Sequence, residues 1–110
     1  MIYFPLMESN KRLDRIFFAL SDSRRRRILE ELSDNQRTVS ELAENLSMAL
    51  SAVSKHIALL EKAELIYKTR QGRTVFCHMN FDIWKEVTMY VGLHLKFWSA
   101  RLDELENFVS

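Results

Sequence analysis

The sequence contains few of the residues that cross-link or interrupt a chain. Cys77 is its one cysteine, so an intrachain disulfide is excluded, and a reducing cytoplasm is the expected location. Two glycines and one proline in 110 residues leave few breaks between secondary-structure elements. No run approaches the roughly 18 apolar residues of a membrane span, and the first residues lack the basic start and apolar stretch of a signal peptide. We therefore expect neither membrane insertion nor export.

Hydrophobic residues, by contrast, are plentiful. They make up 47% of the sequence, which is enough for a packed core and too many for a disordered tail. A length of 110 residues is that of one domain, so we expect residues 1–110 to form a single folded unit. A chain this short buries a limited fraction of its surface, and pairing with a second copy would increase that fraction.

Charge is nearly balanced in total but unevenly distributed, with a formal net charge of +1. Between Lys11 and Arg27 there are seven Lys or Arg residues and two Asp residues, whereas from Phe81 to the end there are three Lys or Arg and five acidic residues. A basic segment and a mildly acidic one in the same domain are compatible with a protein that binds nucleic-acid phosphates with one face and has another role for the other.

Hydrophobic periodicity predicts four helices, a β-hairpin and a long final helix. Apolar residues recur at helical spacing over about 8–20, 23–33, 39–46 and 50–64. Ser21, Asp22 and Ser23 offer side chains that can cap the second helix, and Thr38 with Glu41 has the spacing of a capping box before the third. Residues 65–70 and 73–79 have strand composition and are joined by a turn at Gln71-Gly72, and a helix follows to about residue 108. The order α-α-α-α-β-β-α predicts a mainly α fold with a β-hairpin wing, a winged helix-turn-helix.

The fourth helix and the hairpin are candidate DNA-contacting elements. A short helix, a break of three or four residues and a second helix are the signature of a helix-turn-helix, and short polar side chains on the second helix can reach base edges in the major groove. The candidate base-reading residues are Ser51, Ser54 and Lys55. A basic hairpin after this helix can reach phosphates or a neighbouring minor groove. Its candidate residues are Lys68, Arg70 and Arg73.

Three segments resemble one known family. The run VSELAENLSMALSAVSKHIALLEKAELI, the segment FFALSDSRRRRILEEL and the hairpin RQGRTVFCHM are together similar to the ArsR/SmtB family of bacterial repressors, over roughly residues 13–106. The resemblance implies a homodimer that represses its own or a neighbouring promoter and is released by a signal. The two-fold symmetry of such a dimer predicts a near-palindromic operator in double-stranded DNA.

The sequence departs from the family's pattern at several helix ends. Ser23 stands where relatives often have proline, and Ser47 and Glu64 stand where they often have glycine. Ala49 replaces a serine that usually caps the recognition helix. That change removes a side-chain acceptor, costs about 1 kcal/mol unless Ser51 or water substitutes, and is expected to loosen the helix before DNA binds.

Four consecutive arginines lie at the start of the second helix. Cations in a first turn oppose the helix dipole, so helix stability does not explain them. They either contact phosphate, for which Arg24 and Arg27 are the candidates, or form a solvated face paired with Glu30 and Glu31. His56 lies near the buried face of the fourth helix, where packing is favoured over base reading.

The last helix carries an apolar stripe at heptad spacing. Its members repeat every seven residues, as Trp84, Val91, Trp98 and Leu105, and again four positions later, as Thr88, Leu95, Leu102 and Val109. The helix is nearly thirty residues long, and a chain of this size has little else to cover the stripe. We expect a homodimer face there, with help from the first helix, as the resemblance also implies. The predicted interface residues are Trp84, Val91, Leu95, Trp98, Leu102 and Leu105.

The sequence shows no recognisable effector site. In the resembled family, metal sensors use a cysteine pair in the third helix or His and acidic residues on the last helix. TVSELAENL has no cysteine, and Trp84 follows Asp82 where a ligand would be needed. Cys77 and His78 point to opposite faces of a strand, and His94 is expected at the interface. We expect no metal and no cofactor, and the effector is unknown.

Enzyme activity is not expected, because paired carboxylates, a phosphate-binding glycine loop and a nucleophile–base set are all absent from the sequence. Two rival functions stay open. One is a winged helix that binds protein and has lost DNA, which acidic residues on the wing and recognition face would have favoured. The second is a metal or redox sensor with an unrecognised site, for which metal analysis of the purified protein is the test.

Overall fold

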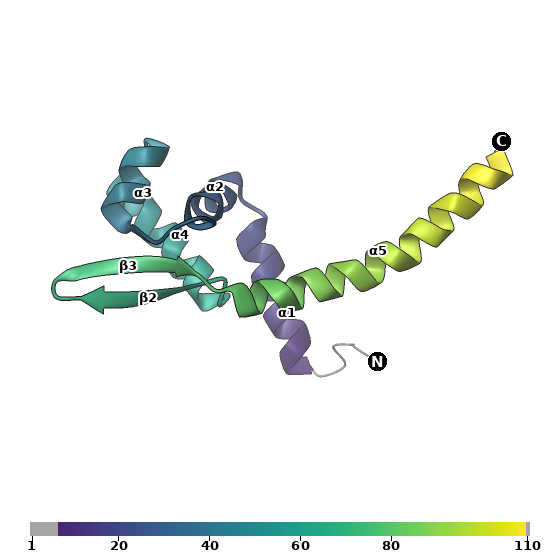
Figure 1. Cartoon of the computed structure of the whole chain (residues 1–110), viewed down its shortest axis with the longest axis horizontal. Coiled ribbons are helices and arrows are strands. Elements are labelled where there is room, and N and C mark those ends of the chain that lie inside the picture. The colour runs from purple at the N-terminus through teal and green to yellow at the C-terminus, as the bar shows by residue number, and fades with distance from the viewer. Residues whose placement is uncertain (1–6, 110) are drawn as a thin grey trace.

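The computed structural model describes residues 7–109, with side chains except at 7–9 and 98. Figure 1 shows a compact body of helices and a β-hairpin, from which the last helix projects as an arm. The molecule extends 59 Å along its longest axis and 21 Å along its shortest. Its helices are α1 (Met7–Leu20), α2 (Ser23–Leu32), α3 (Val39–Leu46), α4 (Leu50–Lys62) and α5 (Phe81–Val109).

The core lies between the helices of the body and the base of the hairpin. Its largest fully buried side chains are Ile28, Leu42, Val53, Ile57, Leu60, Leu65, Ile66 and Cys77. α4 contributes Val53, Ile57 and Leu60, at the spacing predicted from the sequence. Their burial determines which face of α4 is left toward solvent.

The sheet has three antiparallel strands in the order β1-β3-β2, formed by β1 (Arg37–Thr38), β2 (Ile66–Gln71) and β3 (Thr74–Met79). The predicted winged helix-turn-helix is confirmed, and β1, which precedes α3 and pairs with the middle of β3, is an addition to the predicted order. A strand of two residues is too short to show the alternation on which a sequence-based prediction depends.

The hairpin turn consists of Gly72 and Arg73, because Gln71 still pairs with Thr74. The predicted turn at Gln71-Gly72 is therefore one residue too early. Gly72 has a φ of +64°, in the left-handed region that glycine adopts without a steric penalty. Arg73 is thereby carried to the tip of the wing.

The helix ends largely follow the predicted caps. The carboxylate of Asp22 accepts from the backbone N–H of Arg24 at 2.7 Å. Thr38 and Glu41 form both bonds of the capping box, at 3.1 and 2.8 Å. Ser47 and Glu64 have φ values of 53° and 62°. Both positions at which relatives often carry glycine thus require a left-handed backbone, which is the physical reason for glycine there.

Only the first turns of α5 pack on the body. Ile83 and Val87 are buried, and the Arg12 guanidinium of α1 joins Glu86 at 2.7 Å and Glu64 at 3.3 Å. Every described side chain from residue 91 to 109 is exposed. None of the helices formed by residues 7–109 has the length and apolarity that crossing a membrane requires.

Candidate nucleic-acid interface

The outward face of α4 gathers the predicted base-reading residues. α3 and α4 form the helix-turn-helix, joined by residues 47–49. Ser51, Ser54 and Lys55 are all exposed on α4, at spacings of three and four residues that place them side by side. Ala58 and Lys62 are exposed too and continue the same face. The structure therefore brings the three predicted residues together on one polar surface.

α4 begins without a side-chain cap, as the sequence predicted. Ala49 occupies the N-cap position with extended backbone angles, φ −64° and ψ 142°, and offers no acceptor to the first-turn amides. Its carbonyl accepts from the N–H groups of Ala52 and Val53, both at 3.1 Å. The first amides of a helix have no partner within it, so those of Leu50 and Ser51 are available to water or an anion.

One arginine of the 24–27 run is structural. Arg25 is only 6% exposed. Its Nε donates to the Ala19 carbonyl at 2.7 Å and its Nη2 to the Phe18 carbonyl at 3.0 Å, while Nη1 lies 3.5 Å from Nδ1 of His56. The guanidinium also lies over the Phe18 ring, 5.2 Å from its centroid. Arg25 thereby ties the end of α1 to α4.

The sequence analysis did not assign this role, because an arginine side chain is ordinarily expected at the surface. A signal was present, since Arg25 lies three and four residues before Ile28 and Leu29 and so shares their buried face.

His56 packs under Arg25 instead of facing outward. It is 8% exposed, so the expectation that it packs is confirmed. Burial lowers the pKa of His56 below its usual value, which favours the neutral ring at pH 7. The residue beside it, Lys55, points outward from the same turn of α4. The contact with Arg25 therefore lies directly behind the polar surface.

The other arginines of α2 are exposed but differ in their partners. Arg24 joins the Asp22 carboxylate at 3.0 Å, and its hydrogen bonds hold the pKa of Asp22 well below the usual range. Arg26 donates to the Leu20 carbonyl at 2.6 Å. Arg27 has no polar partner among the described residues. The pairing of these arginines with glutamates of α2 is not found in the described part of the chain.

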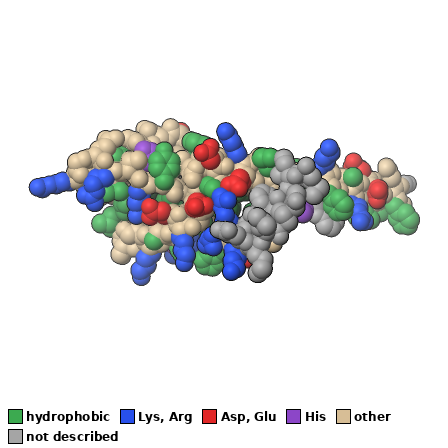
Figure 2. All heavy atoms as spheres, turned by 90° about the horizontal axis from the view of Figure 1, so that it is seen from below, with side chains coloured by type: hydrophobic (Ala, Val, Ile, Leu, Met, Phe, Trp, Pro, Cys, Tyr) green, Lys and Arg blue, Asp and Glu red, His purple; other side chains and the backbone are tan. Residues whose placement is uncertain are grey.

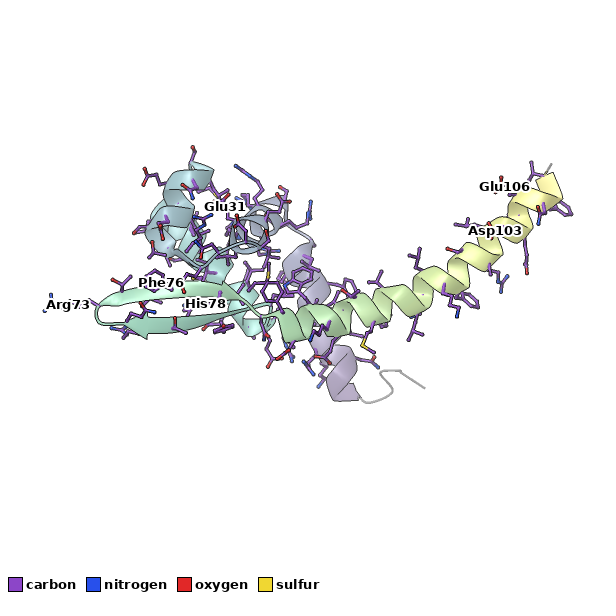
Figure 3. The ribbon with its side chains drawn as sticks, viewed as in Figure 1. Glu31, Arg73, Phe76, His78, Asp103 and Glu106 are labelled. Atoms are coloured by element: carbon purple, nitrogen blue, oxygen red, sulfur yellow. The ribbon has the colours of Figure 1, made fainter. Side chains whose placement is uncertain are left out.

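The wing presents two cations that form no ion pair in the described part of the chain, one near the end of β2 and one in the hairpin turn. Arg70 and Arg73 are exposed and form no ion pair within residues 7–109. Figure 3 shows Arg73 at the hairpin tip, pointing away from the body, and Figure 2 shows Lys and Arg side chains projecting at that end of the molecule. Lys68 differs, because its Nζ lies 3.3 Å from Oε1 of Glu61 on α4. That exposed pair links the wing to α4.

Cys77 and the histidines do not form a reactive or chelating group. Cys77 is fully buried, and burial raises the pKa of its thiol, which disfavours the thiolate. His78 stacks on Tyr67 with ring centroids 4.7 Å apart, and its Nε2 lies 2.6 Å from the Thr69 hydroxyl. His94 lies against Tyr90, with centroids 4.6 Å apart. Among the described residues, no cluster of three His, Cys, Asp or Glu side chains could hold a metal ion.

Most of the predicted interface residues on α5 are uncovered. The exposed fractions are 44% for Val91, 62% for Leu95, 61% for Leu102 and 60% for Leu105. Trp84 is instead half-buried against the core of its own chain, and the side chain of Trp98 lies outside the described residues. On α1, Phe17 is 42% exposed and its ring lies 6.0 Å from that of Tyr90. The apolar surface of α5 thus adjoins one on α1.

Known proteins share this architecture. The family model described as "Bacterial regulatory protein, arsR family" matches residues 22–68. The transcriptional repressor SdpR of Bacillus subtilis is 28% identical over 74 residues, which are 67% of this chain and 82% of the relative.

Two solved structures extend the match. The crystal structure of the ArsR family transcriptional regulator RHA00566 is 34% identical, with a TM-score of 0.73 over 90% of this chain and 97% of that one. A homodimeric winged helix-turn-helix DNA-binding domain, Mb0332 of Mycobacterium bovis, has the same fold at 24% identity, with a TM-score of 0.64 over 79% of this chain and 84% of that one.

These relatives are transcription regulators and not enzymes, which confirms the expectation that this chain has no catalytic role. The chain belongs to the ArsR family of bacterial winged helix-turn-helix, DNA-binding transcriptional regulators.

Proposed function

We propose that this regulator is a homodimeric repressor that reads a near-palindromic operator with two copies of α4. The single observation that carries the proposal is the polar surface of Ser51, Ser54 and Lys55, held outward by the buried face of α4. The wing that follows α4 adds the exposed cations Arg70 and Arg73. A major groove admits one helix, and serine and lysine side chains are able to bond base edges there. A two-fold dimer would place the two half-sites about 34–36 Å apart.

The candidate phosphate-binding cations differ in whether they already form an ion pair within the chain. Arg27, Arg70 and Arg73 need break no ion pair of the described chain before meeting a phosphate. Arg24 must leave Asp22, and Lys68 must leave Glu61. Such exposed pairs are weak, so DNA phosphates can replace their carboxylates. We therefore assign the first three a larger share of the general affinity.

The dimer assignment depends on α5. Val91, Leu95, Leu102 and Leu105 leave an apolar stripe in solvent, and α1 adds Phe17 beside it. The homodimeric state of Mb0332 supports the same assembly here. Residues 1–110 would then act as one domain whose first and last helices form the dimer face, with Trp84 and Trp98 as further members of the face.

Repression, as opposed to activation, is supported by the similarity to SdpR, which is a transcriptional repressor. The site of action would be the cytoplasm, where chromosomal DNA lies. The response would not use the family's usual metal ligands, because Trp84 and the cysteine-free α3 replace them.

The test is a set of DNA titrations at several salt concentrations. Footprinting on the promoter upstream of the protein's own gene supplies the operator, and a scrambled duplex is its control. The double variant Ser54→Ala/Lys55→Ala should lower operator preference, since each lost base contact is worth about 1–3 kcal/mol. Arg70→Ala/Arg73→Ala should weaken both duplexes alike and flatten the log–log salt slope by about 0.9 per lost contact.

Full discrimination in the α4 variant would contradict base reading, and an unchanged salt slope would contradict the wing contact. If the wild-type protein binds no duplex even at low salt, a protein-binding role becomes the better account.

A further inference from the structure

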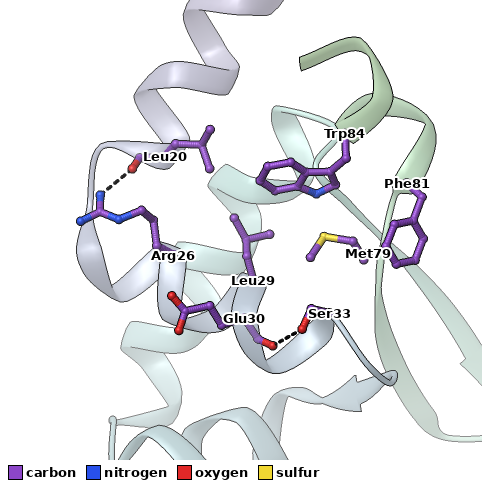
Figure 4. A pocket seen from close by; sticks show the side chains of 8 residues that line it. All are labelled: Leu20, Arg26, Leu29, Glu30, Ser33, Met79, Phe81 and Trp84. Atoms are coloured by element: carbon purple, nitrogen blue, oxygen red, sulfur yellow. Dashed lines mark hydrogen bonds between the residues drawn. The ribbon is translucent and has the colours of Figure 1, made fainter. Parts of the chain in front are cut away.

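A cavity lies where α2, the end of β3 and the first turns of α5 meet (Figure 4). Its volume is about 520 Å³, within the range of small-molecule sites. The walls are almost wholly apolar. They are formed by Leu20, Leu29, Met79, Phe81 and Trp84.

The polar side chains at the rim of the cavity bond to the backbone or lie away from its aromatic walls. Arg26 donates to the Leu20 carbonyl at 2.6 Å, and the Ser33 hydroxyl donates to the Glu30 carbonyl at 2.7 Å. Figure 4 shows both bonds, and it shows the Glu30 carboxylate on the side of Arg26, away from Phe81 and Trp84. The charged groups thus lie at the rim, and the surface that a ligand would cover is apolar, so an uncharged ligand is favoured.

One polar atom in the wall is unsatisfied. Nε1 of Trp84 is buried and has no hydrogen-bond partner among the described residues. The indole edge that carries this nitrogen faces the space between Leu29 and Met79 (Figure 4). Buried donors are nearly always paired, because an unpaired one has lost its water without a replacement. Because the nitrogen is covered by its neighbours, an acceptor in the cavity would supply that replacement once the flexible Met79 side chain beside the indole shifts.

We propose that this cavity binds a small, uncharged organic molecule with a flat apolar body and one hydrogen-bond acceptor, which the N–H of Trp84 engages. The flat body would lie against Trp84, Phe81 and Leu29. Because these walls belong to α2 and α5, and Met79 ends the wing, one ligand would touch the helix-turn-helix domain, the wing and the arm together. Its occupancy would change how α5 sits on the body, and with it the DNA affinity. This regulatory step rests on the proposed function, whereas the binding step does not.

The binding test uses Prodan, an uncharged naphthalene dye with one ketone acceptor. The host is the full chain with Trp98→Phe, so that Trp84 is its one tryptophan. Prodan should bind saturably with micromolar affinity, with blue-shifted dye emission and quenching of Trp84 fluorescence. Trp84→Phe keeps an aromatic wall but removes the N–H, and should weaken binding by about fivefold.

A second variant protects the test against misfolding. Phe81 is 60% exposed, so Phe81→Ala should remove a wall of the cavity without unfolding the chain. Phe108→Ala is the matched control, because Phe108 is 89% exposed at the far end of the same helix and should leave Prodan affinity unchanged.

Several results would overturn the proposal. The dye would lie elsewhere if its binding were not saturable, or if neither Trp84→Phe nor Phe81→Ala weakened it. Binding confined to the dissociated monomer in sedimentation would mean that a second copy fills the cavity. In a separate titration, saturating Prodan should change affinity for the footprinted promoter by about fivefold or more. An unchanged affinity with intact dye binding refutes the regulatory step alone, and a dye-free protein that binds no duplex refutes the proposed function alone.

Discussion

Replacing Ala49 with serine would give α4 the side-chain cap that it lacks. The backbone at this position already has the extended angles of an N-cap residue, φ −64° and ψ 142°, so the new hydroxyl needs no backbone movement to reach the first-turn amides. A serine or threonine cap is worth about 1 kcal/mol relative to alanine. We expect Ala49→Ser to raise the free energy of unfolding by about that amount, measured by urea denaturation at fixed protein concentration.

The reverse change in α3 calibrates this magnitude. Thr38 caps α3 through the 3.1 Å bond from the Glu41 N–H, so Thr38→Ala should lower the free energy of unfolding by a similar amount. If α4 fluctuates at its first turn before DNA binds, Ala49→Ser should also tighten operator binding. If Thr38→Ala is destabilising and Ala49→Ser has no effect, the start of α4 is already satisfied by other means, and the reasoning is wrong.

Comparing a charged with an uncharged cap at position 49 distinguishes an effect on helix stability from an effect on DNA affinity. Ala49→Asp and Ala49→Asn both supply an acceptor, and both should stabilise the fold. The aspartate would also meet DNA phosphates if the start of α4 enters the groove. Ala49→Asp should therefore bind DNA more weakly than Ala49→Asn, and the difference should shrink as salt rises. Equal affinities at low salt would show that the first turn of α4 lies away from the DNA.

Two further predictions concern assembly and pH. Leu95→Glu should dissociate the dimer in sedimentation, because it buries a charge in the predicted interface, whereas Ala100→Glu adds the same charge off the stripe and should sediment as the wild type does. The lowered pKa of His56 means that the unfolded chain takes up its proton more readily than the folded one. The free energy of unfolding should thus fall as pH drops below about 6.5, the ordinary value for His, and His56→Gln should flatten that fall in urea titrations. An identical pH profile for the variant would assign the effect to another group.

Periodicity was sufficient to predict the helices, the hairpin and the outward face of α4. Val53, Ile57 and Leu60 recur at helical spacing, and this pattern alone determines that Ser54 and Lys55 lie on the opposite side. The two-residue strand β1 could not be predicted in this way, since it contains no repeat and exists only because Cys77 and Phe76 of β3 lie beside it. The one-residue error at the hairpin arose because Gly72 can take either central position of a turn.

The role of Arg25 illustrates a different limit. Its charge favours solvent, and only tertiary structure supplies the carbonyls of Phe18 and Ala19 that make burial tolerable. The same holds for the cavity beside Trp84. Residues 20, 29, 79 and 84 are far apart in the sequence and come together only when α5 crosses α2 and the end of β3.

The length of α5 is best understood from what it leaves uncovered. In proteins, most helical stability comes from packing an apolar face, because propensity alone contributes little. The second half of α5 has such a face but packs it on nothing in its own chain, with Leu95, Leu102 and Leu105 each about 60% exposed. Fully burying one leucine is worth roughly 1.5–3 kcal/mol, so covering these side chains against a second copy would stabilise both arms. Formation of the helix in the second half of α5 and formation of the dimer are therefore coupled. A ligand that tilts α5 at its first turn would act at the base of that arm, where a small rotation moves the far end most.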